Sequence, residues 1–150
     1  MRGKKRRLDE DIVFTDEILL DFDNNHPGKM LDVERIGYVA RRLRLEFTDI
    51  KAYRTANGFH VYMKLKEKVH PITAVLIQSL MGSDYARETY NAIRVYNLLA
   101  YPGRYPEYAW HVWNVLYKEK YVDGKLASKE EYDEELTKKI VEVVRRRDEE

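Results

Sequence analysis

The sequence predicts an α+β domain in which helices cover one face of an antiparallel sheet. Short apolar segments alternate with helical ones along the chain, residues 59–65 alternate strictly between apolar and polar side chains, and the last segment has apolar residues at helical spacing. The length of 150 residues suits one compact domain, and a hydrophobic content of 44% is enough to build a core. We expect this domain over residues 12–126, after a charged arm at residues 1–11 and before an amphipathic helix at residues 127–150.

The first half of the chain predicts a strand, a helix and a hairpin. Residues 18–23 form a short apolar segment that leads into the loop-forming residues 24–28, as at the end of a strand. Between Leu31 and Leu45 the apolar residues recur at helical spacing. Residues 48–65 then predict two strands joined by the turn Ala56-Asn57-Gly58.

The second half predicts further helices around one more extended segment. Pro71 can open a helix, and Ser83 can cap another that runs to about residue 100. Residues 113–122 look extended, and Ser128 can cap the final helix. The resulting order, β-α-β-β-α(α)-β-α, is that of a ferredoxin-like or RRM-like domain, in which the first and third strands are neighbours.

Composition excludes several classes of protein. Lys and Arg number 27 against 26 Asp and Glu, so a nucleic-acid-binding surface must be a local patch. The absence of cysteine excludes disulfides, thiolate zinc sites and cysteine nucleophiles. The basic residues 1–7 precede acids and not an apolar run, and no stretch suits a membrane span, so we expect a soluble cytoplasmic protein with no membrane partner. The high charge and the single glutamine are typical of a thermophile protein.

Acidic and basic side chains share one predicted face of the sheet. Residues two apart on a strand point the same way, so Asp21 and Asp23 project together, and His60, Tyr62 and Lys64 oppose the apolar side of their strand. Two neighbouring carboxylates repel each other, and Mg²⁺ or Mn²⁺ would relieve that repulsion and clamp the oxygens of a phosphoryl transfer. Alternatively, these are ordinary surface and turn residues.

Two segments resemble motifs of the archaeo-eukaryotic primases and primase-polymerases. Leu20-Asp21-Phe22-Asp23 resembles the family's hydrophobic-Asp-hydrophobic-Asp motif, and residues 55–62 look like its second motif, in which a hydroxyl residue and a glycine turn precede a histidine on a strand. The resemblance covers about residues 14–65, and the family's catalytic palm is RRM-like. The size would suit a minimal member such as an archaeal virus or plasmid carries.

The resemblance implies a role for each matching residue. Asp21 and Asp23 would be catalytic metal ligands, and His60 would contact the triphosphate of an incoming nucleotide. Thr55, Asn57 and Gly58 would form the nucleotide-binding turn. The cofactor implied is Mg²⁺ or Mn²⁺.

The family's third acidic motif, an Asp after a hydrophobic residue, has no clear counterpart. Asp84 is one candidate for a third metal ligand, although an acid at a helix start is also favoured by the helix dipole. Asp123 is the other candidate, and turn chemistry explains it equally well. The family's zinc-binding module has no cysteine here to build it.

Basic and aromatic residues add weaker indications. Arg87 and Arg94 share a helix face with Asn91 and would reach phosphate or pair with acids. Lys51 and Tyr53, together with Tyr62 and Lys64, would give the open sheet face an affinity for single-stranded bases. The tyrosine-rich residues 101–108, followed by Trp110 and Trp113, would stack bases or pack on the core. The last helix would pack on the domain or dock on a second copy as a homodimer.

Three functions follow. The first is a primase-polymerase-like nucleotidyltransferase whose partners are a nucleoside triphosphate and a single-stranded or template-primer nucleic acid. The second is a non-catalytic RRM-like protein that binds single-stranded nucleic acid as a replication accessory and needs no metal. The third is a nuclease that uses the same acids with water as the nucleophile.

Overall fold

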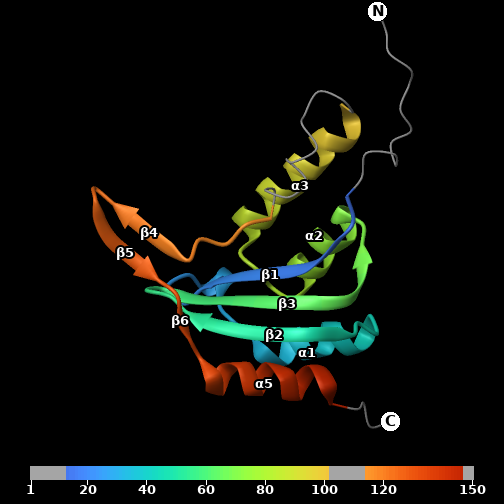
Figure 1. The fold of residues 1–150 in the computed structure, drawn as a ribbon, viewed down its shortest axis with the longest axis horizontal. Helices are drawn as coiled ribbons and strands as arrows, with labels where there is room; N and C mark the ends of the chain where they lie inside the picture. The colour runs from blue at the N-terminus through green and yellow to red at the C-terminus, as the bar shows by residue number, and fades with distance from the viewer. Residues whose placement is uncertain (1–12, 102–113, 147–150) are drawn as a thin grey trace, which may run out of the picture.

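A four-stranded antiparallel sheet and a separate two-stranded hairpin form the frame of the fold, with helices packed on the sheet (Figure 1). The structure, a computed structural model, describes residues 13–101 and 114–146. Its elements are, in chain order, β1 (Thr15–Asp23), the short helix η1 (Pro27–Lys29), α1 (Val33–Arg42), β2 (Phe47–Arg54), β3 (Gly58–Val69), α2 (Pro71–Leu80), α3 (Tyr85–Ala100), β4 (Glu119–Val122), β5 (Lys125–Lys129), β6 (Glu131–Tyr132) and α5 (Glu134–Arg145). The α+β class is confirmed.

The strands of the sheet follow the order β1-β3-β2-β6. The predicted neighbours β1 and β3 pair along most of their length, and β2 and β3 form the predicted hairpin. The extended segment predicted at residues 113–122 does not join this sheet: only β4 is a strand, and it pairs with β5. Its side chains are all exposed, so β4 has no apolar face to bury against the helices.

Alternation along β1 and β3 separates an apolar face from a polar one. Ile18 and Leu20 of β1, together with Val61 and Met63 of β3, are almost completely buried. They belong to one core cluster with side chains of α1, α2, α3 and α5. On β3, the residues that alternate with this core pair, His60 and Tyr62, lie outside the cluster, as period-two alternation requires.

Two predicted helix caps are wrong. Ser128 lies in β5, where its hydroxyl accepts a hydrogen bond from the backbone N–H of Ala56, and Asp133 caps α5 instead. Ser83 does not cap α3, because its hydroxyl is bonded within the interior and the next residue, Asp84, is the cap. Ser83 and Asp84 are neighbours, and both residue types are favoured at a helix N-cap, so sequence preference alone does not show which of the two caps α3.

Side chains from α2, from α3 and from the loop between them cover the outer edge of β1. The Gln78 Oε1 accepts the N–H of Leu19 at 3.0 Å, and the Ser83 Oγ accepts that of Asp21 at 3.0 Å. Arg87 Nη1 donates to the carbonyl of Leu19 at 3.1 Å. At Leu19 and Asp21, backbone groups that a further strand would bind are therefore already paired.

The polar side chains at this edge are held by one buried carboxylate. Glu88, which is 3% exposed, accepts hydrogen bonds from Gln78 Nε2 at 2.6 Å, Ser83 Oγ at 2.8 Å and Arg87 Nη1 at 2.6 Å. The three donors thus share one acceptor. Buried polar groups that are hydrogen-bonded in this way avoid the free-energy cost of leaving water unpaired.

Some expectations lie outside the described residues. They concern the arm at residues 1–11, Trp110 and Trp113, and the tyrosine-rich segment after Tyr101. Within the described ranges, no helix is both long enough and apolar enough to cross a membrane.

Candidate functional site

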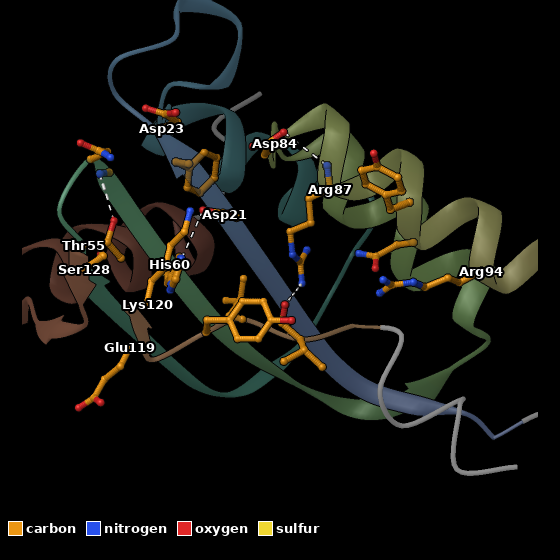
Figure 2. Close-up of a pocket in the computed structure, with 18 of the residues that line it drawn as sticks. Asp21, Asp23, Thr55, His60, Asp84, Arg87, Arg94, Glu119, Lys120 and Ser128 are labelled. Carbon is orange, nitrogen blue, oxygen red and sulfur yellow. Dashed lines mark hydrogen bonds and ion pairs between the residues drawn. The ribbon is translucent and has the colours of Figure 1, made fainter. Parts of the chain in front are cut away.

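Seven of the sequence-predicted site residues line one cleft of about 1090 Å³ (Figure 2). Its walls come from the ends of β1 and β3, from α3, and from residues 115–121 at the start of the β4–β5 hairpin. The predicted residues in its lining are Asp21, Asp23, Thr55, Asn57, Gly58, His60 and Asp84. Two motifs that are separated by α1 and β2 in the chain therefore meet in space.

Asp21 and His60 face each other across the β1–β3 pair. They are directly opposite in the strand register, and 3.4 Å separates Asp21 Oδ1 from His60 Nε2. The Asp21 side chain is 32% exposed and the His60 side chain 12%, so both are only partly accessible to solvent. The predicted juxtaposition of the acidic strand and the histidine strand is confirmed.

A second carboxylate, Glu130, holds the other side of the imidazole. Its Oε1 lies 3.0 Å from His60 Nδ1 and also accepts a hydrogen bond from the Tyr62 hydroxyl. The Glu130 side chain is only 6% exposed. Sequence reasoning missed this residue, because it lies in the charged run Lys129-Glu130-Glu131, which is typical of an exposed segment.

These contacts change the acid–base behaviour of the site. Burial lowers the pKa of His60, but hydrogen bonds to Asp21 and Glu130 outweigh burial, and the pKa is raised above its ordinary value. Burial and the hydrogen bond to Glu130 raise the pKa of Tyr62. His60 therefore keeps both ring N–H groups to a higher pH than a free histidine, one directed at each carboxylate.

The turn between β2 and β3 is locked by its own hydrogen bonds. Thr55 Oγ1 accepts the N–H of Gly58 at 3.1 Å, which leaves the hydroxyl hydrogen free to donate into the cleft. A Cβ at Gly58 would lie 1.9 Å from the carbonyl oxygen of Phe22, so glycine is required for the close approach of β1 and β3. Asn57 Oδ1 accepts from Asn25 Nδ2 at 3.1 Å and ties the turn to the loop after β1.

Asp23 and Asp84 both have structural partners as well as a place in the cleft. Asp23 Oδ1 accepts the N–H of Asn25 at 2.9 Å, a turn interaction. Asp84 Oδ1 caps α3 through the N–H of Ala86 at 2.9 Å and lies 3.2 Å from Lys29 Nζ. Among residues 13–101 and 114–146, no group of three or more His, Asp or Glu side chains could hold a metal ion.

The other third-ligand candidate lies away from the cleft. Asp123 occupies the β4–β5 turn with a φ of 52° and does not line the cleft. A left-handed aspartate in a hairpin turn is ordinary turn chemistry. The structure thus brings together the acids of β1 and the histidine turn, but not a third free carboxylate from the described residues.

The two arginines of α3 differ in their contacts, although both extend from the helix toward the cleft (Figure 2). Arg87 is bound to Glu88 at 2.6 Å and to Asn114 at 2.6 Å, so it supports the fold. Arg94 is exposed and has no ion-pair partner within the described part of the chain. It is therefore a cation available to an anionic ligand.

The cleft combines two chemistries. Its β1–β3 side presents carboxylates, an imidazole and a hydroxyl, α3 contributes Arg94, and the β4–β5 hairpin contributes Lys120. No protein-family model, curated protein or solved structure matches the chain. The geometry of this cleft is therefore the feature from which a function can be inferred.

Proposed function

We propose that this chain is a small primase-polymerase-like domain that transfers a nucleotide onto a nucleic acid with the help of a divalent metal. The observation that supports this most is the convergence of the acidic motif, Asp21 and Asp23, with the histidine turn, Thr55 to His60, in one cleft. The strand order β1-β3-β2, with α1 between β1 and β2, supports an RRM-like palm as the scaffold.

Asp21 and Asp23 have the chemistry to hold Mg²⁺ or Mn²⁺. Hard divalent cations prefer carboxylate oxygens, and Mg²⁺ is often bound by one or two carboxylates together with substrate phosphates and water. The Oδ2 atom of each aspartate has no hydrogen-bond partner among the described residues. Because Asp84 already caps α3 and pairs with Lys29, we assign the metal to Asp21 and Asp23 alone.

The metal, when bound, would polarise the phosphate under attack. The reaction would join a 3′-oxygen to the α-phosphorus of a nucleoside triphosphate and break the bond to the β-phosphate, so that pyrophosphate leaves and the hydroxyl proton is lost to solvent. The chain's own residues would bind the polyanion. His60 supplies a cation stabilised by Glu130, Thr55 a hydroxyl donor, and Arg94 a guanidinium with no partner of its own in the described structure.

A primer-extension assay with Mn²⁺ tests the proposal. The variant Asp21→Asn with Asp23→Asn should lose nucleotide incorporation by about 100-fold or more, because isosteric amides keep the shape but not the charge that binds the metal. A matched control removes two other acids, Asp16→Asn with Asp49→Asn, and should extend the primer as the wild type does. Normal extension by the first variant would refute the assignment.

A second function has specific support. Tyr53 stacks edge-on against Tyr62 on the open face, and Lys51 and Lys64 flank this pair, so the sheet would suit a non-catalytic protein that binds single strands. Oligonucleotide binding that is lost in Lys51→Ala with Lys64→Ala, but is indifferent to Asp21→Ala and to metal, would favour it over nucleotidyl transfer.

A further inference from the structure

The β4–β5 hairpin, residues 117–129, is the most exposed charged element of the described structure. In Figure 1 it projects beyond the four-stranded sheet. Every residue in it is exposed except Ser128, which is half-buried. A two-stranded ribbon with so little burial adds little to the core of the protein. Core packing therefore does not explain which residues the hairpin contains.

The hairpin carries a strong local excess of positive charge. It holds four lysines and two acids, whereas the whole chain is almost neutral. One of the acids, Glu119, accepts a hydrogen bond from the Tyr121 hydroxyl at 2.9 Å. The four lysines have no ion-pair partner within the described ranges and are Lys118, Lys120, Lys125 and Lys129.

Two tyrosine rings accompany these lysines. Tyr117 is 75% exposed and Tyr121 is 59% exposed. An irregularity in the β4–β5 register falls between Lys120 and Tyr121, and both of these residues line the cleft together with Tyr117. Exposed rings beside unpaired lysines suit a single strand, whose bases stack and whose phosphates are anionic.

The hairpin is also fixed to the candidate site. The Ser128 hydroxyl accepts the N–H of Ala56 in the turn before His60, and Glu130, directly after β5, binds His60 itself. A strand lying along the hairpin would therefore run into the same cleft that holds Asp21.

The sheet face offers a poorer surface for a strand. Tyr53 is packed edge-on against Tyr62 and Tyr132, with ring centroids 5.3 and 5.6 Å apart. Lys51 and Lys64 each have an aspartate within 4.0 Å. These rings and charges already have partners inside the protein. In the hairpin, the four lysines have no ion-pair partner among the described residues, and the rings of Tyr117 and Tyr121 stay exposed although the Tyr121 hydroxyl is bonded to Glu119.

We propose that the β4–β5 hairpin is the surface on which this protein holds single-stranded nucleic acid and leads it into the cleft. The lysines contact phosphates, and Tyr117 and Tyr121 stack on bases. This inference deepens the proposed function, since the bound strand would be its template. Strand binding itself requires neither a metal nor a nucleotide.

The test measures fluorescence anisotropy of a labelled deoxythymidine oligonucleotide with the full chain in EDTA, over a series of salt concentrations. The quadruple variant Lys118→Ala, Lys120→Ala, Lys125→Ala, Lys129→Ala should weaken binding on the order of 100-fold at low salt. It should also reduce the slope of log K against log salt by about 3, because each phosphate contact with a single strand contributes about 0.7. Circular dichroism establishes that the variant is folded.

A second variant separates stacking from charge. Tyr117→Ala with Tyr121→Ala should weaken binding by about tenfold per ring and leave the salt slope unchanged, because a ring releases no counterions. The matched control removes four exposed lysines from β3 and its neighbour, Lys51→Ala, Lys64→Ala, Lys66→Ala, Lys68→Ala, and should bind nearly as the wild type does.

Three outcomes would overturn the inference. The first is that the wild type does not bind the oligonucleotide, and the second is that the sheet-face control loses binding while the hairpin variant keeps it. The third is that polyglutamate displaces the oligonucleotide equally well, which would make the hairpin a site for acidic protein. The Asp21→Asn, Asp23→Asn variant should bind the oligonucleotide normally, so failure of the catalytic proposal and failure of this one give different results.

Discussion

The carboxylate of Glu130 binds the imidazole of His60, 70 residues away in the chain, with 3.0 Å between Glu130 Oε1 and His60 Nδ1. Asp21 faces the other ring nitrogen, so the histidine lies between two acids. This arrangement fixes the orientation of the ring and favours its charged form. It also links the segment after the hairpin to the central strand of the sheet.

We predict that Glu130→Gln lowers the pKa of His60. The amide keeps a hydrogen-bonding oxygen but removes the negative charge that, together with Asp21, raises this pKa. The titration of the His60 ring in two-dimensional NMR spectra measures the shift. Glu131→Gln, one residue further along and exposed, is the control and should leave the His60 titration unchanged.

The raised pKa of His60 predicts a decrease in stability as the pH rises. A histidine whose folded pKa exceeds its ordinary value of 6.5 stabilises the folded state fully below that pH, and the contribution is lost as the pH rises through the folded pKa. Urea unfolding of the metal-free protein at pH 6 and at pH 8.5 should give a lower free energy of unfolding at the higher pH.

The variant His60→Gln isolates this effect. The difference in unfolding free energy between pH 6 and pH 8.5 should be smaller for this variant than for the wild type. This holds even if the variant is more or less stable than the wild type at both pH values. His70, whose pKa is lowered by burial, contributes with the opposite sign in both proteins and cancels in the comparison. An equal pH difference in wild type and variant would rule out the raised pKa of His60.

Gly58→Ala should destabilise the protein by about 1–3 kcal/mol, because the new methyl group overlaps backbone that cannot move without breaking the β1–β3 pairing. The nearest atom would be the carbonyl oxygen of Phe22 at 1.9 Å. Chemical denaturation measures the change. Gly28→Ala is the control, since its nearest neighbour would be 3.7 Å away, and its effect should stay within about 0.5 kcal/mol.

Glu88→Ala should lower the free energy of unfolding by about 3 kcal/mol or more, because it leaves Arg87 and three further buried donors without this acceptor. Thermal and urea unfolding report this loss. Glu67→Ala, an exposed residue of β3, should change stability by less than about 0.5 kcal/mol. Similar stability of the two variants would contradict the role given to the buried network.

The central strands and the acid–histidine pair were predictable from local patterns. Strict alternation over residues 59–65 determines which side chains share a face, and the turn at Asn57-Gly58 determines how β2 and β3 pair. Once β1 is placed beside β3, Asp21 must lie on the same face as His60. These features depend on period and turn chemistry, which are visible in a single sequence.

The hairpin and the role of Glu130 were not predictable in the same way. Residues 125–132 are rich in charge and resemble the start of an amphipathic helix, but they form β5 and β6 because β4 and β2 pair with them. The burial of Glu130 depends on the positions of His60 and Tyr62, which lie far away in the chain. Such tertiary partners leave no local signal.

The covered edge of β1 has a consequence for how molecules of this protein meet. An open edge strand is a template on which another molecule can add its own strand, and repeated addition leads to fibrils. Here Gln78, Ser83 and Arg87 occupy the hydrogen-bonding groups that an incoming strand would need. At Leu19 and Asp21, polar side chains therefore block the addition of a strand, a protection that other sheets obtain from proline, bulges or a short final strand.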